Sequence, residues 1–148
     1  MISIPDDFLY VLVSVGPFAF IATQLQGGPV MKARKAMNIP YPNLYATPGH
    51  HEKADAFNRV QRGAQSVYES LSPMQCMALL GGLTYPVVSA AGFNVYLIGN
   101  FLYANGYADV KLDVKTARYK KGGWVKPLGM LVCLGTSFAS AGKLAGLF

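Results

Sequence analysis

The chain has 148 residues, of which 52% are hydrophobic and only 14% are charged, and its formal net charge is +6. The charged fraction is well below the roughly 25% that is usual in soluble domains, so the composition favours an integral membrane protein. The Lys and Arg residues fall in two clusters beside apolar runs, which argues against a nucleic-acid binder, because that function needs a soluble basic face. We expect one domain over residues 1–148, with anionic membrane lipids as partners of the basic clusters.

The first apolar run covers residues 8–31 and contains no charged side chain. Because a membrane-spanning helix needs about 20 apolar residues, this run predicts one span. Pro17 lies near its middle and predicts a kink. A basic cluster follows, and the X-Pro pairs after it predict an irregular loop over 32–53.

The next long run has no charged residue from Ser70 to Ala108, which is enough for most of two helices. Pro86 divides this run, because proline ends one helix and suits the first turn of the next. A second basic loop and a last apolar run complete the chain. The predicted fold is all-α, an integral membrane four-helix transmembrane bundle, with spans at 8–31, 56–84, 87–107 and 124–147.

The basic loops of such a bundle, 32–53 and 109–123, lie on one side of the membrane, while the turn near Pro86 carries no charge. The positive-inside rule places both loops in the cytosol or an equivalent compartment. Both termini then lie on the opposite side.

The cysteines, Cys76 and Cys133, each lie inside an apolar run. No CxxC pair and no Cys/His ligand spacing accompanies them. We therefore expect two buried thiols, no disulfide framework and no metal site.

Polar side chains interrupt the second span on one face. Arg62, Ser66 and Glu69 stand at i, i+4 and i+7 of a helix and therefore share one side. The helix rises roughly 24 Å from Glu69 to Tyr85, which is less than the roughly 30 Å of the hydrocarbon core, so Glu69 is expected inside the core. Charged groups at such depth are costly, and they either serve a function or form a satisfied ion pair within the bundle.

Three more polar residues are expected near the same membrane face. Tyr103 and Tyr107 stand at i and i+4 of the third span, and Arg118 lies in the second basic loop. Taken singly, the tyrosines are typical of an interfacial aromatic belt, and Arg118 of a headgroup contact. Together with Arg62 and Glu69 they suit a ligand that carries carboxylates, an amine and a thiol, because cations bind carboxylates and lower the pKa of a thiol.

Three motifs resemble a known family. They are Phe57-Asn58-x-x-Gln61-Arg62 with Glu69, the upstream Lys32-Ala33-Arg34-Lys35, and Leu102-Tyr103-Ala104-x-Gly106-Tyr107. In this order and spacing the chain resembles the MAPEG family from about residue 8 to its end. The resemblance implies a homotrimer that binds glutathione as co-substrate between adjacent protomers, near the cytosolic face.

The resemblance also implies roles for individual residues. Arg118 is the implied catalytic residue, which stabilises the glutathione thiolate, with Lys115 or Lys121 as alternatives. The implied glutathione-binding residues are Arg34, Arg62, Ser66, Glu69, Tyr103 and Tyr107. The chain departs from the family pattern at Ser66, where the family usually has asparagine, and at Ala64, where close relatives have a polar side chain.

The implied activity is that of a glutathione transferase or peroxidase that acts on hydrophobic electrophiles or lipid hydroperoxides. The departures at Ser66 and Ala64 support an alternative, a non-catalytic accessory subunit of a larger membrane complex. A regulatory protein that binds lipid in the same cleft is a third reading. The implied membrane is the endoplasmic reticulum, with a mitochondrial membrane as the alternative.

Overall fold

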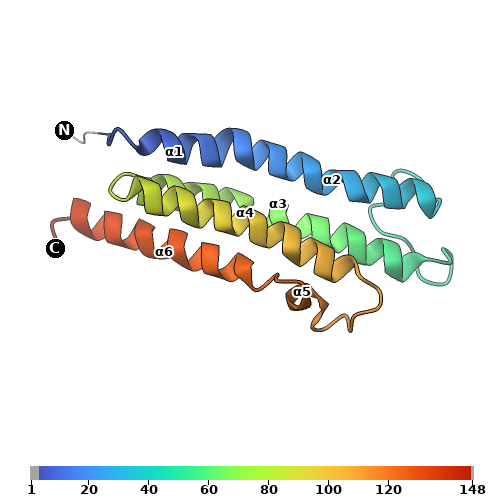
Figure 1. Cartoon of the computed structure of the whole chain (residues 1–148). Helices are drawn as coiled ribbons and strands as arrows, with labels where there is room; N and C mark the ends of the chain where they lie inside the picture. Colours follow the sequence, from blue (N-terminus) through green and yellow to red (C-terminus); the bar gives the residue numbers. More distant parts are fainter. Residues whose placement is uncertain (1–3, 148) are drawn as a thin grey trace.

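The computed structural model describes residues 4–147, and every regular element in this part of the chain is helical (Figure 1), which confirms the all-α prediction. Prolines and glycines, rather than charges, mark most of the breaks between the helices. The elements are α1 (Phe8–Val13), η1 (Ser14–Phe18), α2 (Ala19–Ala36), α3 (Ala54–Gly82), α4 (Pro86–Ala108), α5 (Ala117–Lys120) and α6 (Val125–Leu144).

The first three elements form one continuous helix, Phe8–Ala36. Pro17, at which the sequence predicts a kink, lies in the π-helical turn η1. Gln75 of α3 donates from Nε2 to the carbonyl oxygen of Val15 in this turn, at 2.7 Å. A polar side chain of a neighbouring helix therefore satisfies the backbone of the irregular turn, as a membrane interior requires.

The predicted loop over 32–53 begins later than expected, because α2 continues through the first basic cluster to Ala36. Ala, Met, Lys and Arg are strong helix formers, so the basic residues extend the helix instead of ending it. The helix ends where Asn38 adopts a left-handed conformation with φ 51°. The N–H of Ile39 then bonds to the carbonyl of Arg34 at 3.0 Å, which is a Schellman-type end.

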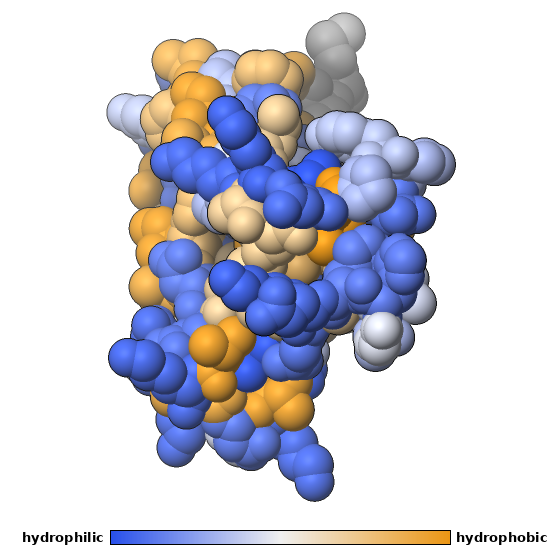
Figure 2. Space-filling view, turned by 90° about the vertical axis from the view of Figure 1, so that its right-hand side faces the viewer, coloured by the Kyte–Doolittle hydropathy of each residue, from blue (hydrophilic) through white to orange (hydrophobic). Residues whose placement is uncertain are grey.

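The long helices run side by side, and the connections at their two ends differ in character (Figure 1). The first and last described residues lie at the same end as the short turn between α3 and α4. The long connections, 37–53 and the segment that carries α5, lie at the opposite end. Figure 2 looks onto that opposite end, where the surface is mostly hydrophilic, while an apolar flank continues along one side.

Three helices are long and apolar enough to cross a membrane: Phe8–Ala36, Pro86–Ala108 and Val125–Leu144. Helix α3 is the longest regular α-helix at 29 residues, but Arg59, Arg62 and Glu69 lie between its start and its middle turn. A fourth span through α3 therefore stays a prediction. Cys76 is exposed on α3, so the expectation that it is buried is wrong, whereas Cys133 is buried as expected.

Helices α4 and α6 pack with their backbones in close contact, because a glycine of each helix faces the backbone of the other. A Cβ atom on Gly99 would lie 2.3 Å from both the N and Cα atoms of Lys126, and one on Gly129 would lie 2.3 Å from the N atom of Tyr96. Larger residues at these positions would hold the helices apart. The close approach brings the first turn of α6 against the part of α4 that carries Tyr103.

Candidate functional site

The predicted polar face of α3 is present, and its two charged members bind each other. Arg62 donates from Nη1 to Oε1 of Glu69 at 2.7 Å. The side chains keep 40% and 47% of their surface exposed, so this ion pair lies at the edge of the helix packing and is accessible. An exposed pair of this kind contributes little to stability, about 0–1 kcal/mol. Each group can therefore give up this ion pair and bind a ligand instead, at a small cost in free energy.

Ser66, the third member of that face, is buried and is bound by a lysine of another helix. Lys126, in the first turn of α6, donates from Nζ to Oγ of Ser66 at 2.9 Å and to its backbone carbonyl at 3.1 Å. The same ammonium lies 5.0 Å from the ring centre of Tyr103 and 5.8 Å from that of Tyr96, within cation–π range. Lys126 therefore joins α3, α4 and α6 at the level of Ser66.

The tyrosine pair of α4 continues this cluster toward the loops. The rings of Tyr103 and Tyr107 stack with centres 6.1 Å apart and an interplanar angle of 14°. The guanidinium of Arg118 lies 5.3 Å from the ring centre of Tyr107. Arg118 therefore extends the row of aromatic rings with a second cation.

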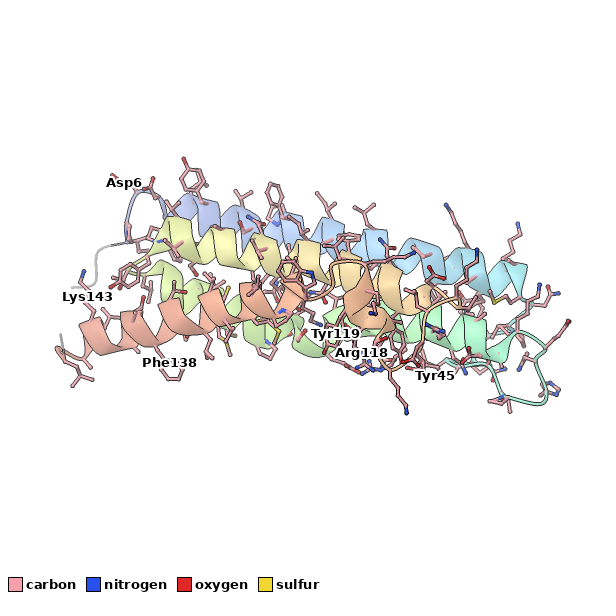
Figure 3. The ribbon with its side chains drawn as sticks, turned by 60° about the horizontal axis from the view of Figure 1, so that its bottom comes forward. Asp6, Tyr45, Arg118, Tyr119, Phe138 and Lys143 are labelled. Atoms are coloured by element: carbon pink, nitrogen blue, oxygen red, sulfur yellow. The ribbon has the colours of Figure 1, made fainter. Side chains whose placement is uncertain are left out.

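Arg118 is placed by the close packing of α5 against α4. Gly106 permits this approach, since a Cβ atom there would lie 2.4 Å from the carbonyl oxygen of Ala117. Within residues 4–147, the Nε atom of Arg118 is buried without a hydrogen-bond partner. Figure 3 shows Arg118 and Tyr45 toward the end with the long connections, away from Asp6 and Lys143.

A cavity of about 300 Å³ opens beside this row, between the start of α3 and the two long connections. Tyr45 lies at its rim and is hydrogen-bonded to Gln65 of α3. The lining residues are Tyr45, Asp55, Asn58, Arg59, Arg62, Tyr107 and Val114. Arg62 and Tyr107 thus face a common polar space, which connects the α3 and α4 parts of the predicted site.

Arg34 lies apart from the other predicted site residues within the chain. Its Nη1 atom donates to the carbonyl of Asn43 at 2.8 Å and to that of Ile39 at 3.3 Å, and its guanidinium lies 4.6 Å from the ring centre of Tyr41. It lines a different cavity of about 500 Å³ between α2 and α3, together with Ala64. Arg34 and Arg62 therefore line two different cavities of the chain.

A family model for the MAPEG family matches residues 12–142, from the end of α1 to the last turn of α6. The chain belongs to the MAPEG family. This family includes glutathione transferases and related proteins, and its members commonly use glutathione. Because it belongs to this family and has three apolar helices, this MAPEG protein is an integral membrane protein.

The donor set of this MAPEG protein fits glutathione chemically. The Arg62 and Lys126 cations and the hydroxyls of Tyr103 and Tyr107 suit carboxylates, and the exposed Glu69 carboxylate suits an amine. The guanidinium of Arg118, which lies over the ring of Tyr107, is a cation that suits an anionic sulfur. The fit thus extends to each ionisable group of the tripeptide.

Two residues that matter to this MAPEG site were not predicted from the sequence. In the sequence, Lys126 looks like another cation of the second basic loop. A lysine in the first turn of an apolar span is nevertheless a signal of a site residue. Arg59 lies three residues before Arg62 and is 5% exposed. The buried Arg59 supports the candidate site from the protein interior, whereas the exposed Arg62 side chain is part of the candidate site itself.

Proposed function

We propose that this MAPEG protein is a membrane-bound glutathione transferase or peroxidase that acts on hydrophobic electrophiles or lipid hydroperoxides. The observation that carries the proposal is the row of cations, hydroxyls and one carboxylate that runs from Glu69 past Lys126 to Arg118 at the end with the long connections. Within the family, the likeness that we propose is to microsomal glutathione S-transferase 3.

Each residue has a proposed role in binding. Arg62 and the hydroxyls of Tyr103 and Tyr107 hold the carboxylates, and Glu69 holds the amine. Arg118 holds the sulfur in its anionic form, because a guanidinium within hydrogen-bond reach lowers the pKa of a thiol. Glutathione supplies the nucleophile. In the transferase reaction its thiolate sulfur bonds to an electrophilic carbon while the bond from that carbon to a leaving group such as chloride breaks. In the peroxidase reaction two glutathione molecules reduce a hydroperoxide to an alcohol and water and form a disulfide.

The proposal includes an assembly. Arg34 lines a different cavity from Arg62 and bonds to its own connection, so we propose that the Arg34 of a neighbouring protomer completes the Arg62 cluster. A homotrimer with one site at each interface meets this requirement. It also leaves the apolar outer faces of α2 and α6 toward lipid, from which a hydrophobic second substrate enters laterally.

The proposed topology has four spans, with α3 as the fourth, because α3 packs against both α4 and α6 and its second part carries no charge. The long, basic connections then face the cytosol, where they contact anionic lipid headgroups. The endoplasmic reticulum is the proposed membrane, and a mitochondrial membrane is the alternative.

The purified protein in lipid nanodiscs tests this function. We expect conjugation of a chloronitrobenzene or reduction of a fatty-acid hydroperoxide with glutathione, and a loss of at least about tenfold in Arg62→Ala and Arg118→Ala, because a hydrogen bond to a charged group contributes about 1.5–3 kcal/mol. Lys143→Ala, at the far end of α6, is the matched control and retains activity. Wild-type protein that neither binds glutathione nor turns over these substrates would contradict the proposal.

A second candidate function is an accessory subunit of a larger membrane complex. It is favoured by one observation: Ser66 is already hydrogen-bonded by Lys126, and Ala64 offers no polar group, so two of the ligand contacts that the family pattern implies for α3 are weakened. This candidate expects co-purification with other membrane proteins in a mild detergent. Recovery of a free trimer alone would count against it.

A further inference from the structure

Helix α6 contributes a charge to the site that neither the motifs nor the family comparison assigns. The Lys126 ammonium is held by two acceptors on one residue, Oγ and the carbonyl of Ser66, and lies over the ring of Tyr103. An ammonium has three N–H donors, and these contacts use two of them. The third is left for the aromatic face or for a ligand.

The charged and titratable groups around Lys126 come from two helices. Arg62 and Glu69 of α3 act on it electrostatically, and Tyr96 and Tyr103 of α4 present their rings to it. On its own helix the other cation, Lys143, is in the last turn. Arg118 of α5 lies over the next ring along the row, that of Tyr107.

These neighbours leave the charge of Lys126 without an anionic partner. The one carboxylate in reach, Glu69, is paired with Arg62, and no carboxylate of residues 4–147 lies within ion-pair distance of the Lys126 ammonium. A cation placed against a membrane span without a counter-ion is costly, and such charges are functional by default. The part of the site around Lys126 consequently has two cations, Arg62 and Lys126, beside one carboxylate, and this excess attracts an anion.

We propose that Lys126 is a positioning residue of the glutathione site: it fixes Ser66 and Tyr103, and its uncompensated charge favours the anionic form of the bound thiol. This inference rests on the proposed function. It differs from that function in placing part of the thiol activation on α6, where a second cation adds to Arg118. A purely structural Lys126 would fix Ser66 and Tyr103 equally well but would not affect ionisation of the ligand.

The test is a pH titration of bound glutathione, read by the ultraviolet absorbance of its thiolate, with affinity measured separately by calorimetry. Lys126→Met removes the charge and keeps roughly the length of the side chain. Lys126→Arg keeps the charge, and Lys143→Met is the matched control on the same helix. We expect Lys126→Met to raise the apparent pKa of the bound thiol by about one unit or more, because a nearby opposite charge shifts a pKa by roughly 1–3 units. Lys126→Arg and Lys143→Met should stay close to the wild type.

The outcomes separate this inference from the proposed function. Wild-type protein that lowers the thiol pKa, together with a folded Lys126→Met that lowers it equally, would overturn the inference and leave the function standing. Wild-type protein that does not bind glutathione overturns both. If Lys126→Met does not fold, Lys126→Gln replaces it in the same titration, since the amide can still donate to Ser66 without carrying a charge.

Discussion

The guanidinium of Arg59 donates a hydrogen bond from Nε to the carbonyl oxygen of Tyr107 at 2.8 Å. Its Nη2 atom donates to the carbonyl of Leu112 at 3.0 Å. One buried side chain of α3 thus binds both the last turn of α4 and the connection that follows it. Because Tyr107 belongs to the candidate site and Arg118 lies over its ring, the position of this end of the candidate site depends on Arg59.

Arg59→Met should therefore destabilise the protein by about 2–4 kcal/mol, because it leaves two carbonyls without donors and removes charge-assisted hydrogen bonds. Thermal unfolding in detergent, followed by circular dichroism, measures the effect. Arg62→Met is the matched control three residues away, where an exposed ion pair contributes only about 0–1 kcal/mol. Equal losses in the two variants would show that Arg59 has no special structural role.

Glu69→Gln separates ligand binding from stability at the exposed ion pair. Stability should change by less than about 1 kcal/mol, whereas glutathione affinity should fall about tenfold or more, because the amine loses a charged partner. Titration calorimetry with glutathione measures the affinity. A glutathione analogue that lacks the α-amino group should bind wild type and variant equally, and a tenfold preference of the analogue for wild type would refute the assigned role.

Gly99→Ala tests the close approach of α4 and α6. The added Cβ atom would lie 2.3 Å from backbone atoms of Lys126, which only a shift of α6 can relieve, so we expect a loss of about 1–3 kcal/mol. Activity should fall as well, since the first turn of α6 carries Lys126. Gly135→Ala, where nothing lies within 4 Å of the added atom, should instead be neutral or stabilise by up to about 1 kcal/mol. A neutral Gly99→Ala would contradict the described packing.

The ion pair between Asp109 and Lys121, 2.8 Å long, gives the loop region a pH dependence. The Lys121 ammonium, and then the backbone N–H of Lys111, hold the pKa of the Asp109 carboxyl below its ordinary value. The stabilisation is therefore fully present above the carboxyl pKa of the unfolded chain, about 3.9, and is lost as the pH falls through the lowered pKa of the folded state.

Lys121→Ala should raise the pKa of Asp109 toward its ordinary range, and an NMR titration of the carboxyl carbon measures this shift. Lys120→Ala is the matched control, because Lys120 is the neighbouring lysine at the end of α5 and is not in this ion pair. An unchanged pKa in Lys121→Ala would mean that the ion pair does not persist in solution.

Much of the local structure could be predicted because single features of the sequence decide it. Charge-free runs place the apolar helices, and Pro86 starts α4 where the break was predicted. The i, i+7 spacing brings Arg62 to Glu69, and the i, i+4 spacing stacks Tyr103 on Tyr107. Each of these relationships lies within one helix, whose geometry is fixed by hydrogen bonds between near neighbours.

The sequence by itself determined an all-α membrane protein and the polar faces of its helices. Only the tertiary structure decided that Lys126 reaches Ser66, that Arg59 binds the end of α4, and that Arg34 lines a cavity of its own. These contacts join residues that are far apart in the chain, and they depend on how closely two helices approach. Glycines such as Gly99 set that distance, and spacing within one helix carries no information about it.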